Sequence, residues 1–264
     1  MEYPMMVNDE AFKNVYFSRL VENHEIAHSY FPFYMGTNES RYAFMDEGWA
    51  TTLELLIGRT ESTVDSANTF YRRFRVNRWI HDPSGEEDLP IITPADALVG
   101  VAYGNNAYGK PSLAYLAMKD LLGNTLFKHC LHAYMDRWHG KHPIPWDFFN
   151  CFNNASGRNL NWFWNNWFFT NNYIDLTLKS VTRSGSGYQV SIDNTGGFAV
   201  PFDMIIRYAD GSMDSIHQSP AVWQQDQAHT SINLKTRKKI IALSLDMGIF
   251  MDANETDNSW EKKQ

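Results

Sequence analysis

Two histidines four residues apart, with a glutamate directly after the first, constrain the fold more than any other feature of this 264-residue chain. The segment reads Asn23-His24-Glu25-Ile26-Ala27-His28. In an α-helix, residues i and i+4 lie on one face, so His24 and His28 can bind the same metal ion. The pattern H-E-x-x-H is typical of zinc sites in which the glutamate is the general base. We therefore expect Glu25 to take a proton from a zinc-activated water as that water attacks a carbonyl.

A catalytic zinc ion needs a third protein ligand and one position left for water. Glu47 is separated from His28 by 18 residues and begins a second expected helix, 47–58. A carboxylate at that helix start, brought back by a short loop, can complete a His-His-Glu site for one zinc ion. The alternative is that His24, His28 and Glu25 are ordinary helix residues, because a lone H-E-x-x-H also occurs by chance.

The spacing of H-E-x-x-H, eighteen residues and then Glu47-Gly48-Trp49-Ala50 resembles the gluzincin zinc aminopeptidases of peptidase family M1, which include aminopeptidase N. The family's third-ligand segment reads N-E-G-F-A, so Asp46 and Trp49 are departures from it. A second carboxylate lies seven residues after the ligand glutamate in that family, near a ligand histidine, and Glu54 holds this position. Such an acceptor fixes the imidazole tautomer. The alternative for Glu54 is an exposed helix glutamate.

A tyrosine near the second half of the helical region is the candidate oxyanion donor. Amide hydrolysis develops an oxyanion that needs a hydrogen-bond donor, which a tyrosine hydroxyl can supply. The family uses the tyrosine of a Y-E-K-G segment about sixty residues after the ligand glutamate. Tyr108 follows Glu47 by 61 positions and precedes Gly109-Lys110, so the resemblance implies this role for it. Pro111 departs from the family pattern, and Tyr103 is a rival.

The first residues, Met1-Glu2-Tyr3, resemble the end of the family's G-x-M-E-N segment, whose glutamate binds the free amino terminus of the substrate. Glu2 lies 22 positions before His24, but the glycine is absent and Tyr3 replaces the usual asparagine. A frayed terminal residue is the alternative. The resemblance implies that the family's amino-terminal domain is missing, so the activity of the chain by itself is open. No signal peptide is visible, and the compartment also stays open.

Composition and charge exclude several other classes. The formal net charge of −7 argues against a nucleic-acid partner, and no stretch is long and apolar enough to span a membrane. Cys130 and Cys151 are expected to be buried thiols, although one disulfide between them stays open. A cluster of four arginines is expected to form a solvated helix face: Arg72, Arg73, Arg75 and Arg78.

The texture of the sequence changes near residue 171. Before it the spacing is helical, and aromatic helices are expected near 124–138, 146–154 and 161–169. After it come short runs rich in β-branched residues, separated by turn signals: 174–178, 188–192, 202–208, 230–234 and 240–245. We predict an α+β multidomain fold, with a mostly helical, thermolysin-like (gluzincin) peptidase domain, 1–171, and an antiparallel β-sandwich, 172–264, whose tail from Asn254 to Gln264 is loose.

These patterns predict a zinc metallopeptidase, and the resemblance implies an aminopeptidase acting on peptides with a free amino terminus. Three alternatives stay open: a zinc endopeptidase, a metal-binding module without turnover, and an enzyme like the leukotriene-hydrolysing branch of the family. The sequence leaves open the oligomeric state and the side chain preferred at the cleaved residue.

Overall fold

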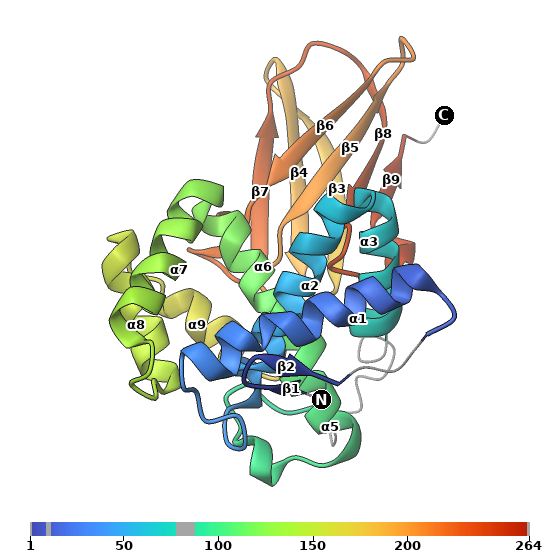
Figure 1. The fold of residues 1–264 in the computed structure, drawn as a ribbon. Coiled ribbons are helices and arrows are strands. Elements are labelled where there is room, and N and C mark those ends of the chain that lie inside the picture. The colour runs from blue at the N-terminus through green and yellow to red at the C-terminus, as the bar shows by residue number, and fades with distance from the viewer. Residues whose placement is uncertain (1, 9–11, 78–87, 263–264) are drawn as a thin grey trace. The chain divides into compact units, whose positions relative to one another are not determined.

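The computed structural model describes residues 2–8, 12–77 and 88–262. The chain divides into two compact units, Met1–Asn171 and Asn172–Gln264. The first unit is mostly helical and the second holds two antiparallel sheets, which confirms the predicted α+β fold class (Figure 1). Among the described residues, no helix has both the length and the apolar character that crossing a membrane requires.

The first unit starts with a short hairpin and continues as a series of helices. Its described elements are β1 (Glu2–Tyr3), β2 (Met6–Val7), α1 (Val15–Ala27), η1 (Ser29–Tyr34), η2 (Ala43–Met45), α2 (Glu47–Glu61), α3 (Val64–Tyr71), η3 (Arg72–Val76), η4 (Ala95–Ala97), α5 (Gly100–Gly104), η5 (Asn105–Gly109), α6 (Lys110–Leu122), α7 (Asn124–Trp138), α8 (Pro145–Ser156) and α9 (Asn161–Phe168). The aromatic helices expected from the sequence are therefore present, with ends that agree to within two residues.

Helix α2 lies at the centre of this unit, in contact with α1, α3 and α6. Nearly every side of it is covered, and even the polar residues Thr51 and Thr52 are buried. The helix passes close to α1 at Gly58, where an added Cβ would lie 2.7 Å from Leu20 Cδ2. Glycine at this position lets the two helices approach closely, and they carry the residues of the predicted metal site.

Stacked aromatic rings fix the beginning of α2. The Trp49 ring lies 4.1 Å from the Tyr115 ring and 5.2 Å from the Phe31 ring, measured between centroids. The Tyr115 hydroxyl donates a hydrogen bond to the Phe44 carbonyl at 2.9 Å. Buried aromatic pairs of this kind add about 0.5–1.5 kcal/mol each beyond the area they bury. Because Trp49 is two residues from Glu47, this packing restrains the position of the expected third ligand.

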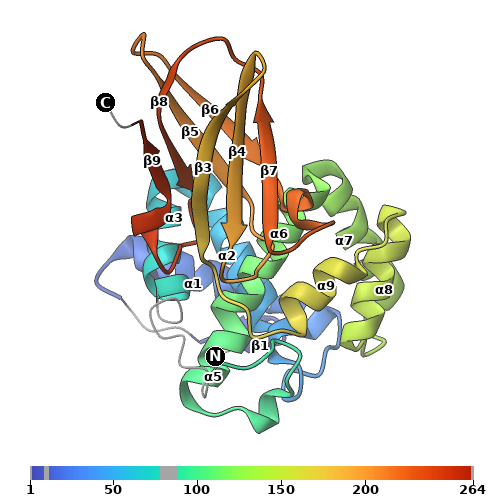
Figure 2. The same cartoon turned by 180° about the vertical axis from the view of Figure 1, so that it is seen from behind.

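The second unit is a β-sandwich whose two sheets face each other (Figures 1 and 2). Its elements are β3 (Leu176–Ser184), β4 (Gly187–Asn194), β5 (Phe202–Tyr208), β6 (Met213–Gln218), η6 (Pro220–Trp223), β7 (His229–Leu234), β8 (Ile240–Asp246), η7 (Glu255–Asp257) and β9 (Ser259–Glu261). One sheet has the order β3-β4-β7 and the other β6-β5-β8-β9. In β5 every second residue is buried, as the period of two predicts.

The structure corrects the expectation of a loose tail from Asn254. Strand β9 pairs with β8, and the Leu245 amide donates to the Asn258 carbonyl at 2.8 Å. The Thr177 hydroxyl donates to Asp257 at 2.9 Å. The segment 254–261 is polar because it covers a sheet edge and faces solvent on one side, and a polar edge strand resembles a disordered tail in composition. Strand β6 escaped the sequence analysis for the same reason, because its residues are mostly exposed.

The two cysteines are free and buried, as expected from their aromatic surroundings. Cys130 is on α7 and Cys151 on α8. Burial raises the pKa of both thiols, to about 11 for Cys130, so neither favours the reactive thiolate form. They are packing residues of the helical unit.

Candidate metal centre

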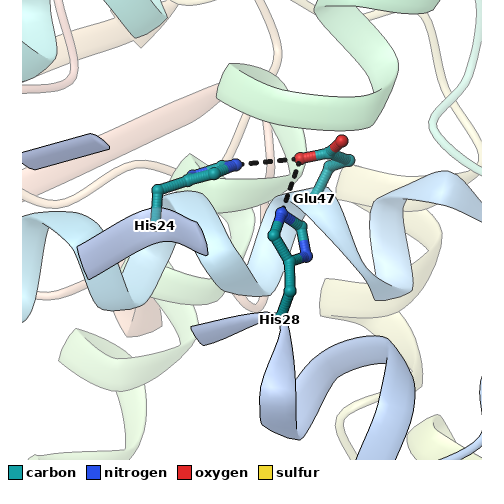
Figure 3. Close-up of side chains that lie close together, drawn as sticks. All are labelled: His24, His28 and Glu47. Atoms are coloured by element: carbon teal, nitrogen blue, oxygen red, sulfur yellow. Dashed lines mark hydrogen bonds and ion pairs between the residues drawn. The ribbon is translucent and has the colours of Figure 1, made fainter. Parts of the chain in front are cut away.

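Helices α1 and α2 bring His24, His28 and Glu47 together. The distance from Glu47 Oε2 is 3.0 Å to His24 Nε2 and 3.5 Å to His28 Nε2. One ligand atom from each residue lies within 4.8 Å of the others, and Figure 3 shows both imidazoles directed at the same carboxylate. Two ligand atoms that bind one zinc ion tetrahedrally at about 2.0–2.2 Å would lie about 3.3–3.6 Å apart. The arrangement therefore fits a zinc ion.

The carboxylate of Asp46 holds His28. Its Oδ1 lies 2.7 Å from His28 Nδ1, and the Phe31 carbonyl lies 3.0 Å from the same nitrogen. A proton on Nδ1 leaves the Nε2 lone pair free to bind a metal. Asp46 is 3% exposed, directly precedes Glu47, and was treated in the sequence analysis only as a departure from the family pattern. A carboxylate adjacent to a ligand was the signal that could have found it.

The carboxylate of Glu54 holds His24 in the same way. Its Oε2 lies 3.2 Å from His24 Nδ1, and Glu54 is 1% exposed, so the alternative of an exposed helix glutamate is wrong. Glu54 follows Glu47 by seven positions, which is two turns of α2, so both carboxylates lie on the face that meets α1. Both metal-site histidines thus have one ring nitrogen near Glu47 and the other on a buried carboxylate.

Arg75 corrects the expectation of a solvated arginine cluster. Its Nη2 makes an ion pair with Glu54 Oε2, and its Nε donates to Glu54 Oε1 at 3.3 Å. The side chain is only 19% exposed. The sequence analysis missed it because four arginines within seven residues resemble a solvated face, and only the ion pair with Glu54 on α2 distinguishes Arg75 from the rest. Arg78 lies outside the described residues.

These contacts determine the pKa values of the histidines and of Glu47. Burial works to lower the pKa of His28, but Asp46 and Glu47 outweigh it and raise that pKa to about 10. The pKa of His24 is raised too, because its contacts with Glu47 and Glu54 outweigh its burial. Burial works to raise the pKa of Glu47, but both histidines lower it. The Glu47 carboxylate is thus ionised, and it lies next to two imidazoles whose raised pKa values favour their cationic form.

Tyr108 lies at the same cluster, on the π-helical segment η5. Its hydroxyl donates to Glu47 Oε1 at 2.6 Å, and its ring stacks on the His24 ring at 6.1 Å between centroids. Burial, followed by the charge of Glu47, raises the pKa of Tyr108, so the hydroxyl keeps its proton and can donate. Two residues later Lys110 is fully buried and donates to Asp88 at 2.7 Å, which fixes this part of the chain. Tyr103 is 36% exposed.

An open cavity of about 790 Å³ lies over the cluster. Its polar end is lined by the two histidines, Glu47, Tyr108, Arg75 and Glu25, which is partly buried. The structure therefore brings together six of the sequence-predicted site residues: His24, Glu25, His28, Glu47, Glu54 and Tyr108. Glu2 is part of β1, but its side chain lies outside what the structure describes.

Comparison with solved structures shows a similarity of fold. The fold is similar to that of Legionella pneumophila aminopeptidase A, solved in complex with aspartic acid, with a TM-score of 0.59, 18% identity, and coverage of 86% of this chain and 25% of that chain. An M1 zinc metallopeptidase from Deinococcus radiodurans, bound to a Tyr-Ser-Ala substrate, gives a TM-score of only 0.45 at 17% identity, over 56% of this chain and 32% of that one. This chain thus spans about a quarter of the length of the Legionella protein.

A search of curated proteins gives no match. The sequence model of the Peptidase family M1 domain matches residues 5–167, which is more than half of the chain and includes His24, His28 and Glu47. The chain therefore belongs to peptidase family M1.

Proposed function

We propose that this protein is a zinc metallopeptidase that hydrolyses the amino-terminal bond of peptides. The convergence of one ligand atom each from His24, His28 and Glu47, all within 4.8 Å of one another, carries the proposal. The buried carboxylates of Asp46 and Glu54 on the two Nδ1 atoms support it, because such acceptors orient histidine ligands. We assign the chemistry to the helical unit, and a supporting role to the β-sandwich.

Each residue of the cluster has one role in this proposal. His24, His28 and Glu47 would hold the ion, which when bound supplies a Lewis acid that polarises a carbonyl and lowers the pKa of a water. The Glu25 carboxylate accepts a proton from the attacking water and returns it to the leaving amine nitrogen. The Tyr108 hydroxyl, which keeps its proton, donates to the oxyanion that develops on the former carbonyl oxygen.

Specificity for the amino terminus is the part of the proposal that rests on resemblance. Glu2 would pair with the ammonium group of the substrate and so restrict cleavage to the first peptide bond. The partner is then a peptide with a free amino terminus. The fold similarity to an aminopeptidase supports this choice over an endopeptidase. Comparing a free peptide with its acetylated form tests it, because an aminopeptidase cleaves only the first and an endopeptidase cleaves both.

Substitution of the general base tests the chemistry. We expect about one zinc per chain in the wild-type protein and in Glu25→Gln, with peptide hydrolysis reduced about 10²- to 10⁴-fold in the variant. His28→Ala should lose the metal. Glu22→Gln is the matched control, because Glu22 is an exposed glutamate on the same helix. Wild-type protein that binds no zinc refutes the proposal, and zinc binding without hydrolysis favours the metal-binding module.

A further inference from the structure

We infer that the cavity over the metal site contains an aromatic wall that binds a large apolar side chain of the substrate, next to the cleaved bond. The wall is defined here as Phe12, Phe17, Phe70 and Phe74, which line the same cavity as the three expected ligands. The inference rests on the proposed function and adds to it the class of side chain that the site prefers.

The four rings form one continuous apolar surface. Phe17 is its centre, with ring centroids 4.5 Å from Phe12, 5.3 Å from Phe70 and 5.4 Å from Phe74. The rings of Phe70 and Phe74 are 4.6 Å apart. Their interplanar angles include the edge-to-face geometry that aromatic pairs prefer, so a further ring can join the cluster in the same manner.

Helix α1 places this wall beside the metal site. Phe17, Val21, His24 and His28 follow one another at intervals of four, three and four residues, so all lie on one helix face. The seven residues from Phe17 to His24 span about 10 Å along the helix. An extended peptide advances about 3.3 Å per residue, so a substrate held at His24 has its flanking residues within reach of the wall.

The wall keeps surface that a ligand can cover. Phe74 is 39% exposed, and the other three rings are partly buried. The core of the same unit differs, since Phe148 and Phe152 are 0% exposed. Covering exposed apolar surface is favourable by about 25 cal/mol per Å². An aromatic or branched aliphatic side chain therefore gains more from this wall than a small or charged one.

Arg73 provides the rival reading, in which the cavity selects an acidic side chain. Its guanidinium lies 5.2 Å from the centroid of the Phe74 ring, and it lines the same cavity. Arg73 is exposed, so a pair with it would be screened by water and weak. Arg75, the second arginine of the cavity, is already paired with Glu54. The cavity thus offers four aromatic rings but only one solvated arginine to a substrate side chain. This favours an apolar side chain over an acidic one.

Ligand binding tests the wall without requiring turnover. The probes are hydroxamates, which bind zinc through their own oxygens, in pairs that carry a benzyl or a methyl group. In amino-acid hydroxamates this group imitates the side chain on the amino-terminal side of the cleaved bond. In 2-substituted succinyl hydroxamates it imitates the side chain on the carboxyl-terminal side. The affinities are measured by calorimetry on protein whose zinc content has been determined. Aspartate hydroxamate is the acidic probe.

We expect benzyl to bind about 10- to 100-fold more tightly than methyl in at least one orientation. Phe74→Ala should reduce this preference about threefold to tenfold, because it removes one ring of four. Phe169→Ala is the matched control, since Phe169 is also 39% exposed and does not line the cavity. It should leave the preference unchanged.

The outcomes separate this inference from the proposed function. Equal binding of benzyl and methyl probes in both orientations, a preference that survives Phe74→Ala, or tighter binding of the aspartate probe overturns the wall alone. Zinc-loaded protein that selects benzyl but hydrolyses no peptide supports the wall and refutes the peptidase. Protein that binds no zinc overturns both.

Discussion

Removing the Arg75 guanidinium should destabilise the protein, because the buried Glu54 carboxylate then loses its arginine partner and keeps the contact with His24. In Arg75→Met, the Glu54 carboxylate, which is 1% exposed, loses both of its contacts with Arg75. Methionine keeps much of the apolar stem, so the change tests the charge more than the packing. Among the nearby groups, Arg75 is the largest influence that lowers the pKa of Glu54 against the effect of burial.

The expected cost is about 3 kcal/mol of the free energy of unfolding. Deleting one partner of a buried ion pair costs about 3–5 kcal/mol, and the 19% exposure of Arg75 places this pair near the low end. The cost should shrink as pH falls. The lowered pKa of Glu54 contributes stability that is present above its unfolded value of 4.5 and is lost as pH falls through the folded value.

Urea unfolding of the metal-free protein, with a chelator present, measures the free energy. Arg41→Met is the matched control, because Arg41 and Asp96 are 53% and 60% exposed and 3.9 Å apart, and such pairs contribute about 0–1 kcal/mol. Adding Glu54→Gln to Arg75→Met removes the carboxylate charge that has lost its arginine. The double variant should therefore lose about 1–3 kcal/mol less free energy of unfolding than the sum of the single variants. Equal losses in Arg75→Met and Arg41→Met, or strict additivity, would refute the reasoning.

Three further predictions concern the site and the sandwich. Tyr108→Phe should lower kcat about 10²- to 10³-fold without changing the zinc content, and an unchanged kcat would remove it from the oxyanion role. Because Asp46 and Glu47 outweigh burial and raise the pKa of His28 to about 10, its ring keeps a proton at neutral pH. Zinc should therefore release about one proton from His28 on binding, measurable by calorimetry in buffers of different ionisation enthalpy; an affinity that does not fall as pH falls contradicts this. Gly187→Ala should destabilise the sandwich by about 1–3 kcal/mol in thermal unfolding, because its Cβ would lie 2.1 Å from the Leu234 carbonyl; an unchanged transition would be the opposing result.

The parts of the site that depend on local geometry could be predicted from the sequence. The four-residue spacing of His24 and His28 puts both on one helix face whatever surrounds them, and the interval to Glu47 suggested the rest. The contacts of Asp46 with His28 and of Arg75 with Glu54 depend instead on how the loop after α1 and the segment η3 are placed relative to α2. No periodicity in the sequence records those long-range contacts.

The strands of the second unit also differ in how well the sequence predicts them. Strands with one buried face, such as β5, carry the alternation that predicts them. Strand β9 has few apolar residues because it only closes a sheet edge, so composition alone suggested a loose segment. The catalytic role of Glu25 and the contribution of Glu2 stay predictions, because they concern a bound substrate.

The close approach at Gly58 brings α1 and α2 into contact at a second place besides the metal site. Glu47 and Gly58 are eleven residues apart on α2, and α1 touches the first through its histidines and the second through Leu20. A methyl group at position 58 would lie 2.7 Å from Cδ2 of the buried Leu20, so either the Leu20 side chain or α1 itself has to shift. A shift of α1 would change the distances between the histidine Nε2 atoms and Glu47 Oε2 without any alteration of the ligands. The glycine that allows this close approach thus lies about three turns of helix from the metal-site glutamate.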